Sequence, residues 1–255
     1  MKSDERFRNI CNFRDLGGIP VAAGRTIKPG CFIRSAGLYV FNEDELKILE
    51  EEYQLKTVLD LRSGEEIAHS PDPVLPGVNY ILRSGVVTEA QKEIDFSPDG
   101  MRKQGEAGKQ QLSKLRSYYE EIQFGNRAFK EMFHQILYGN TPILFHCASG
   151  KDRTGIAAML IELALGASKE DVIADYLTSN HYLKERLDIA RSGVDPDKDP
   201  ELYELMTMMD GVSENTIKIV FDAIERRYSS YREFIMTEYS LTEADMNYLL
   251  KTYTI

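Results

Sequence analysis

The chain contains 255 residues, of which 42% are hydrophobic and 28% charged, and its formal net charge is -10. Such values are typical of a globular protein with one large domain. The acidic balance argues against bulk binding to nucleic acid and against general attraction to anionic membranes. An anionic substrate would therefore have to bind at a local basic site.

The chain shows no signal for stable membrane insertion or for classical export. No apolar run approaches the ~20 residues that span a bilayer, and the first residues, MKSDERFRNICNF, lack the apolar core of a signal peptide. Three widely spaced cysteines form neither a disulfide framework nor a zinc-binding pattern. We therefore expect a reduced, cytoplasmic protein, while export by a non-classical route and the oligomeric state stay open.

The first third of the chain predicts short strands and one helix. Residues 12–36 are rich in Gly and Pro between short β-type pieces, which indicates an edge sheet with many turns. Asn42, followed three residues later by Glu45, indicates the start of a helix. KTVLDLRS, residues 56–63, is typical of a buried strand with a functional tip, and VNYILR, residues 78–83, is a weaker strand candidate.

The rest of the chain predicts helices around one more strand. Residues 107–139 predict helix with a break near Gly125, and TPILFH, residues 141–146, predicts a buried strand. Further helices are expected at 154–165, 169–190, 200–210, 214–228 and 242–252. The pattern predicts an α/β fold, with a central sheet flanked by helices and a helical C-terminal part. We expect one domain over 1–255, in which 84–125 is a candidate surface insertion or lid.

The stretch HCASGKDRTG, residues 146–155, carries the chemistry. A loop between a strand and a helix points backbone N–H groups inward, and the following helix adds its positive end, so this loop can cradle a phosphate-sized anion. Cys147, at the base of the cradle, would be a thiolate in that field. Arg153 offers a planar fork that can bind two phosphoryl oxygens.

Neighbouring side chains complete the expected site. Thr154 can donate its hydroxyl to the thiolate, and His146 can brace the loop. The arrangement predicts in-line attack of sulfur on phosphorus, with charge stabilised by amides and a guanidinium, and it requires no metal and no other cofactor. The plain alternative is a buried thiol at a strand end beside a solvated arginine.

This stretch resembles the signature loop of the Cys-based protein tyrosine phosphatase superfamily, and within it the atypical bacterial and fungal branch that has Lys-Asp before the arginine. Further segments resemble the same branch in the right order, namely 12–18, 27–38, 58–66 and 175–180. The resemblance implies a phosphatase of the tyrosine or dual-specificity type, with the corresponding α/β sheet.

The resemblance also implies roles for the loop residues. Cys147 would be the nucleophile that forms a phosphocysteine intermediate, and Arg153 the phosphate clamp. Lys151 is associated in that branch with acceptance of phosphoinositides beside phosphotyrosine, and Asp152 is the candidate general acid. The other expected substrate contacts in the loop are Ala148, Ser149, Gly150 and Thr154.

The general acid stays open, because the chain has no tryptophan and therefore lacks the Trp-Pro-Asp loop of classical tyrosine phosphatases. Asp152 is the first candidate, since it lies in the loop itself. Asp60, at a strand tip, is the second, either as the acid or as the group that orients the clamp; a plain ion pair with Arg62 is the alternative. Asp72 and Asp99, each after Ser-Pro, rank behind them.

Two sets of basic residues are further candidates for substrate binding. Arg34 and Arg62 end strand-like pieces and could face the phosphate mouth, although pairing with Glu65 or Glu66 is as plausible. The stretch 101–117 carries five basic residues against one acidic residue. It is either a solvated helix face or a surface that faces the substrate.

The sequence therefore predicts a metal-independent phosphatase that hydrolyses phosphomonoesters. Phosphotyrosine is the expected substrate, and phosphoserine, phosphothreonine and phosphoinositides are further candidates, so the expected partners are phosphorylated proteins or phosphoinositides rather than nucleic acid. Two rivals use a similar loop: a phosphate- or phosphotyrosine-binding module without turnover, and a sulfur-transfer protein with a persulfide cysteine.

Overall fold

The computed structural model describes residues 4–7, 12–86 and 108–255, and a five-stranded sheet lies at its centre. The strands are β1 (Arg14–Asp15), β2 (Phe32–Ser35), β3 (Thr57–Asp60), β4 (Asn79–Leu82) and β5 (Ile143–His146). Their order is β1-β2-β5-β3-β4, with β1 antiparallel to β2 and the other neighbours parallel. The carboxyl ends of β2, β5 and β3 therefore meet at one edge of the sheet.

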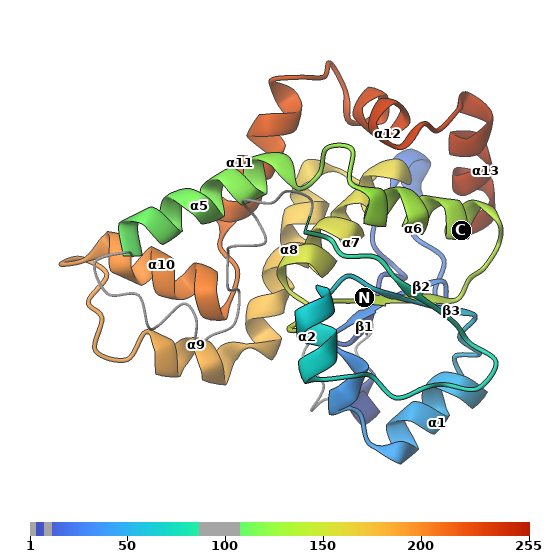
Figure 1. The fold of residues 1–255 in the computed structure, drawn as a ribbon. Helices are drawn as coiled ribbons and strands as arrows, with labels where there is room; N and C mark the ends of the chain where they lie inside the picture. Colours follow the sequence, from blue (N-terminus) through green and yellow to red (C-terminus); the bar gives the residue numbers. More distant parts are fainter. Residues whose placement is uncertain (1–3, 8–11, 87–107) are drawn as a thin grey trace.

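Helices surround this sheet and form the C-terminal part of the chain (Figure 1). They are α1 (Glu43–Glu51), α2 (Gly64–His69), α5 (Gly108–Glu121), α6 (Arg127–Leu137), α7 (Asp152–Ala164), α8 (Lys169–Tyr182), α9 (Lys184–Ala190), α10 (Pro200–Asp210), α11 (Glu214–Glu225), α12 (Tyr231–Tyr239) and α13 (Glu243–Tyr253). The predicted α/β fold with a helical C-terminal part is confirmed. None of the helices in the described ranges is long and apolar enough to cross a membrane.

Alternating strand residues fill two separate hydrophobic cores, because successive side chains of a strand point to opposite faces. Ile33 and Leu144 join a smaller core that contains Leu49 of α1. Phe32 and Phe145 join the larger core that is formed with α6, α7 and the C-terminal helices. Helix α7 is buried on all sides, as expected of a helix with an apolar sequence all round. It therefore holds the preceding loop rigidly against the sheet.

Local sequence patterns predicted most of the helices and strands correctly. Asn42 and Glu45 form a capping box at the start of α1, and the break near Gly125 separates α5 from α6. β1 is an edge strand as predicted, whereas β2 lies inside the sheet beside β5. The predicted helix 169–190 is divided at Leu183 into α8 and α9.

Two α-helices within the described ranges were not predicted. Helix α2 is short and starts with a capping box between Ser63 and Glu66. Helix α12 buries Phe234 and Ile235 and packs on α7, so tertiary contacts stabilise it more than its own sequence does. The proposed insertion or lid at 84–125 stays a prediction, because residues 87–107 lie outside the described residues.

Candidate active site

The loop 147–151 connects the central strand β5 to α7 at the carboxyl edge of the sheet. His146 is level with Ser35 on β2 and with Asp60 on β3. The segments that follow these three strands therefore lie around the loop. This edge is the place where open α/β sheets bind their ligands.

Three consecutive carbonyl groups of the loop accept hydrogen bonds from outside it. Gly37 N–H donates to Ala148 O at 3.2 Å, the Asn12 side-chain amide to Ser149 O at 3.1 Å, and Arg34 Nη2 to Gly150 O at 3.0 Å. In a trans peptide the next N–H points away from the carbonyl oxygen, so the following N–H groups point to the inner side of the loop. Among the described residues, the N–H groups of 148–152 bind no acceptor. The loop thus offers the row of donors that an anion cradle needs.

Gly150 allows this loop to lie directly on the end of β2. Its φ is +66°, and a Cβ at this position would lie 2.4 Å from the carbonyl oxygen of Ser35 and 2.7 Å from the nitrogen of Ala36. Any side chain here would push the loop away from β2. Glycine is required both for its conformation and for its size.

The clamp arginine is fixed by a carboxylate that was not predicted. Arg153 is buried, and its Nη1 and Nη2 donate to Glu66 of α2 at 2.6 and 2.7 Å. Burial would raise the pKa of Glu66, but the hydrogen bonds and charge of Arg153 lower it to about 2. The paired forks fix the plane of the guanidinium close to Cys147, which is 2% exposed. The only local feature of the sequence around Glu66 is its spacing from Ser63, which is typical of a helix start and does not indicate a contact with Arg153.

Asp60 and Arg62 belong to a buried ion network beside the loop. Arg62 donates to Asp60 at 2.7 Å and lies 2.8 Å from Asp72, and its Nη1 donates to Ser70 O at 2.7 Å. Asp72 in turn lies 3.1 Å from Nε2 of His146. Asp60 was a candidate for the group that orients Arg153, but the hydrogen bonds to Arg153 described above are made by Glu66. Arg62 has charge partners inside the protein, so a substrate contact has no support in this arrangement.

Asp60, Asp72 and His146 carry ligand types that bind metal ions, and their atoms lie within 4.8 Å of one another. Arg62 already supplies positive charge to both carboxylates, and Tyr80 donates hydrogen bonds to both. We therefore interpret the cluster as structural. It orients His146, whose Nδ1 lies 3.2 Å from the carbonyl oxygen of the next residue, the expected nucleophile.

Asp175 of α8 joins two buried arginines beneath the loop. Arg14 Nε donates to it at 2.9 Å and Arg34 Nη1 at 2.7 Å. Burial would raise the pKa of Asp175, but the charges of the two arginines lower it. Because Arg34 also donates to Gly150, it supports the loop from below rather than facing the mouth. The segments 12–18, 27–38 and 175–180 thus meet in one cluster.

Glu162 of α7 adds a second carboxyl group to this cluster. It is fully buried, and neither carboxyl oxygen has a hydrogen-bond partner among the described residues. Burial and the charge of Asp175 raise its pKa well above the usual value. This shift favours the protonated form of Glu162, so Asp175 is the main charge partner of Arg14 and Arg34.

Asp152 and Lys151 contact helices outside the α/β core. Asp152, with 15% of its side chain exposed, accepts hydrogen bonds from the Tyr119 hydroxyl of α5 and from the Lys151 ammonium. Lys151 also donates to the carbonyl oxygen of Met208 in α10 at 2.7 Å. Of the candidate acids, Asp152 is the one that lies next to the loop. Its partner Tyr119 is 33 positions away in the chain, so nothing in the local sequence indicated this contact.

Other predicted site features are only partly described. The Thr154 hydroxyl is buried without a hydrogen-bond partner among the described residues, so the expected bond to the Cys147 sulfur is not formed. From the basic stretch, Lys114 and Arg116 are exposed on α5. Asp99, Arg102, Lys103 and the side chain of Lys109 lie outside the described residues.

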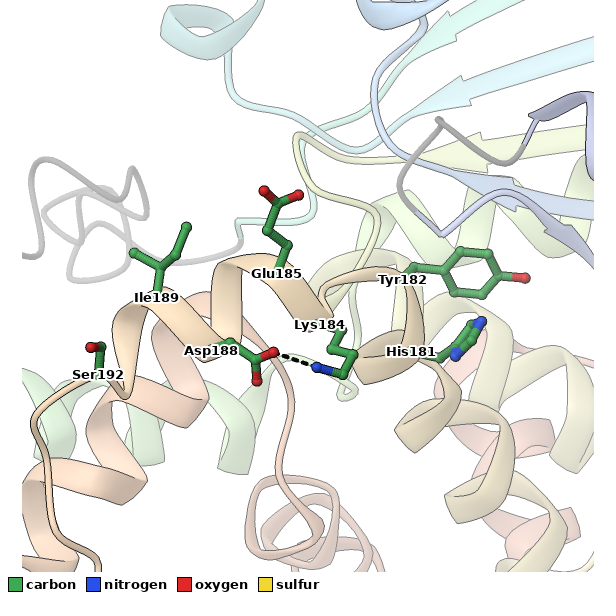
Figure 2. Close-up of a pocket in the computed structure, with 7 residues that line it drawn as sticks. All are labelled: His181, Tyr182, Lys184, Glu185, Asp188, Ile189 and Ser192. Carbon is green, nitrogen blue, oxygen red and sulfur yellow. Dashed lines mark hydrogen bonds and ion pairs between the residues drawn. The ribbon is translucent and has the colours of Figure 1, made fainter.

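A surface pocket of about 690 Å³ lies apart from the loop (Figure 2). Its lining residues are His181, Tyr182, Lys184, Glu185, Asp188, Ile189 and Ser192. Lys184 pairs with Asp188, so the lining carries both signs of charge. It contains none of the loop residues and does not form an anion cradle.

The first prediction concerns the clamp. Glu66→Gln should lower kcat/KM for a phosphomonoester roughly 10- to 100-fold, because a charge-assisted hydrogen bond contributes about 1.5–3 kcal/mol. Glu65→Gln, on the exposed adjacent position of α2, is the matched control and should behave as wild type. Because the pKa of Glu66 is lowered to about 2, the pair is complete above pH 4.5 and is lost only as the pH falls toward 2. Equal kinetics of the two variants would contradict the assignment.

The second prediction concerns the cluster beneath the loop. Asp175→Asn leaves two buried arginines without a charge partner and should lower the free energy of unfolding by about 3–5 kcal/mol. Glu162→Gln keeps the size of the side chain and removes its titration, so it should be tolerated because the pKa of Glu162 is raised. It should even gain stability relative to wild type as the pH rises above 4.5, because only wild type must take up a proton on folding. Urea unfolding at several pH values measures both effects, and a strongly destabilised Glu162→Gln would show that Glu162 is ionised.

Comparison with known proteins finds relatives among the tyrosine phosphatases. The chain is 32% identical over 179 residues to a Cupriavidus necator protein with a provisional tyrosine-protein phosphatase name, covering 70% of this chain and 64% of that protein. It is 30% identical to the tyrosine-protein phosphatase of Nostoc commune, with 71% and 62% covered. It is 28% identical to the triple specificity protein phosphatase PtpB of Mycobacterium tuberculosis, with 66% of each chain covered. The matched part thus spans a little under two thirds of the first two relatives.

Several solved structures are also similar to this chain, and two of them illustrate the likeness. The catalytic domain of the PP-IP phosphatase SIW14 from S. cerevisiae has 15% sequence identity and a TM-score of 0.36, with 83% of this chain and 91% of that chain covered. P. aeruginosa TpbA in complex with pTyr has 13% identity and a TM-score of 0.34, with 84% and 96% covered. The family model described as the tyrosine phosphatase family matches residues 6–255. The chain belongs to the tyrosine phosphatase family.

Proposed function

We propose that the protein is a metal-independent phosphatase that hydrolyses phosphomonoesters, phosphotyrosine among them, through a phosphocysteine intermediate. The observation that carries this proposal is the loop itself. Its carbonyl groups are bonded outward, its N–H groups point inward, and Cys147 and the fixed guanidinium of Arg153 stand at its two ends. This combination supports binding of a phosphoryl group in line with the sulfur.

The chemistry would proceed in two steps. The Cys147 thiolate attacks phosphorus, the bond from phosphorus to the leaving oxygen breaks, and Asp152 gives its proton to that oxygen. Water then attacks the phosphorus of the phosphocysteine, the phosphorus–sulfur bond breaks to return the Cys147 thiolate, and Asp152 takes up a proton from this water as inorganic phosphate leaves. Arg153 and the loop amides bind the equatorial oxygens in both steps.

The substrate range is the open part of the proposal. Phosphoinositides carry several phosphates and would need positive charge beyond one cradle. In this structure the Lys151 ammonium contacts Asp152 and Met208, which supports single phosphomonoesters more than polyphosphates. Phosphoserine, phosphothreonine and phosphoinositides belong in the same assay panel. A reduced, cytoplasmic setting is also a proposal, supported by the free thiols of Cys31 and Cys147.

The third prediction tests the nucleophile. Cys147→Ser should abolish release of p-nitrophenol from its phosphate ester in the presence of EDTA while still binding phosphate, because the hydroxyl is a weak nucleophile without a base. Arg153→Lys should lose most activity, since an ammonium cannot bridge two oxygens. Rapid acid quenching of wild type should trap a phosphoryl group on the Cys147 peptide. Turnover by Cys147→Ser would refute the mechanism. Binding of phosphate by the wild-type protein without turnover would favour the rival function, a phosphate- or phosphotyrosine-binding module.

The fourth prediction tests the acid. Asp152→Asn should lower kcat on phenyl phosphate far more than on p-nitrophenyl phosphate, because p-nitrophenolate leaves with little need for a proton. The basic limb of the pH–rate profile should disappear with the carboxyl group. Asp60→Asn is the comparison, since Asp60 was the rival and lies in the neighbouring ion network. If Asp60→Asn shows the leaving-group pattern and Asp152→Asn does not, the assignment of the acid is wrong.

A further inference from the structure

Asp152 is held by two hydrogen-bond donors that approach from the side of α5 and α10. The Tyr119 hydroxyl donates to Oδ1, and the Lys151 ammonium lies 2.9 Å from Oδ2 and 3.1 Å from Oδ1. Lys151 is itself fixed by the carbonyl oxygen of Met208 at 2.7 Å. The orientation of this carboxylate therefore depends on helices that are not part of the sheet and its immediate cover.

Tyr119 is a rigid and constant donor. It is 2% exposed, and its ring packs edge-on against Tyr118 at 5.3 Å. Burial and the neighbouring charge of Asp152 raise the pKa of Tyr119 well above its usual value, so the phenol keeps its proton throughout the range in which enzymes work. Helix α5 packs along α11 and also contacts α10, as Figure 1 shows for the helices at the edge of the molecule. The helical part of the chain thus fixes the place of the hydroxyl.

We propose that Tyr119 is a positioning residue for Asp152, so that proton transfer at the loop depends on a tyrosine of α5. When Asp152 gives its proton to the leaving oxygen, a carboxylate forms, and the Tyr119 O–H and the Lys151 N–H bonds stabilise this anion. The same bonds fix the free carboxylate for the second step, in which it takes a proton from water. This inference rests on the proposed phosphatase function. It assigns a role in catalysis to helix α5.

The fifth prediction tests this role with Tyr119→Phe, which removes only the hydroxyl. We expect kcat on phenyl phosphate to fall about tenfold or more, in line with loss of a hydrogen bond to a charged group, with a smaller loss on p-nitrophenyl phosphate and little change in KM. A hydrogen bond to a carboxylate favours its ionised form, so the basic limb of the pH–rate profile should move to higher pH. In an Asp152→Asn background the same substitution should add no further loss.

Tyr239→Phe is the matched control. Tyr239 is also buried, and its hydroxyl donates to the carbonyl oxygen of Gln123 at 2.6 Å. Its loss should lower the melting temperature in a similar way but leave the pH–rate profile and the leaving-group dependence unchanged. A Tyr119→Phe variant that behaves like Tyr239→Phe in both readouts would overturn the inference.

An isosteric change covers the case in which Tyr119→Phe is poorly folded. Incorporation of 3-fluorotyrosine at position 119 makes the phenol a stronger donor and should move the basic limb to lower pH, opposite to Tyr119→Phe. An unchanged limb would overturn the positioning role even if the fold is intact. Failure of the proposed function is distinguishable, because it would show as absence of Cys147-dependent turnover in the wild-type protein.

Discussion

The arrangement of the site depends on one buried carboxylate, Asp175, which binds Arg14 and Arg34 at the same time. This pairing joins strands β1 and β2 to helix α8, and through Arg34 it reaches the carbonyl oxygen of Gly150. Two charged arginines would be costly to bury without this partner. Burial and the charge of Asp175 raise the pKa of Glu162, so this carboxyl group offsets the charge of the two arginines less than an ordinary glutamate would. The cluster thus both orders the cradle and contributes to its field.

A second network of charged side chains lies beside the loop on the other side of β5. Arg62 pairs with Asp60 and Asp72, and Asp72 lies 3.1 Å from Nε2 of His146, the residue before Cys147. Glu66 belongs to the adjacent helix and binds Arg153, so the residues that follow β3 supply both a structural ion pair and the support of the clamp. The loop is therefore held from β2 on one side and from β3 on the other, while its inner face remains free for the phosphoryl group.

In the proposed mechanism, the helical part of the chain acts on the acid Asp152 rather than on the nucleophile Cys147. Cys147 and Arg153 depend on the sheet, α2 and α7, whereas Asp152 and Lys151 contact α5 and α10. Substitutions in these outer helices should accordingly act on proton transfer before they act on phosphate binding. In the proposed mechanism, substitutions in these outer helices would therefore change the selectivity for the leaving group without changing the loop that binds phosphate.

Residues close together in the chain specify the strands predicted within 56–63 and 141–146, which the structure places at 57–60 and 143–146. Local residues likewise specify the capping box of α1 and the loop with Cys147, Arg153 and Asp152. The partners of the charged side chains were decided only by the tertiary structure. Arg34 meets Asp175 across 141 positions and Arg153 meets Glu66 across 87, and these pairings follow from the placement of β5 between β2 and β3. Spacing along the chain cannot encode that strand order. The sequence therefore left open whether Arg34 and Arg62 bind substrate or pair with carboxylates, and it did not indicate the contacts of Glu66 with Arg153 or of Tyr119 with Asp152.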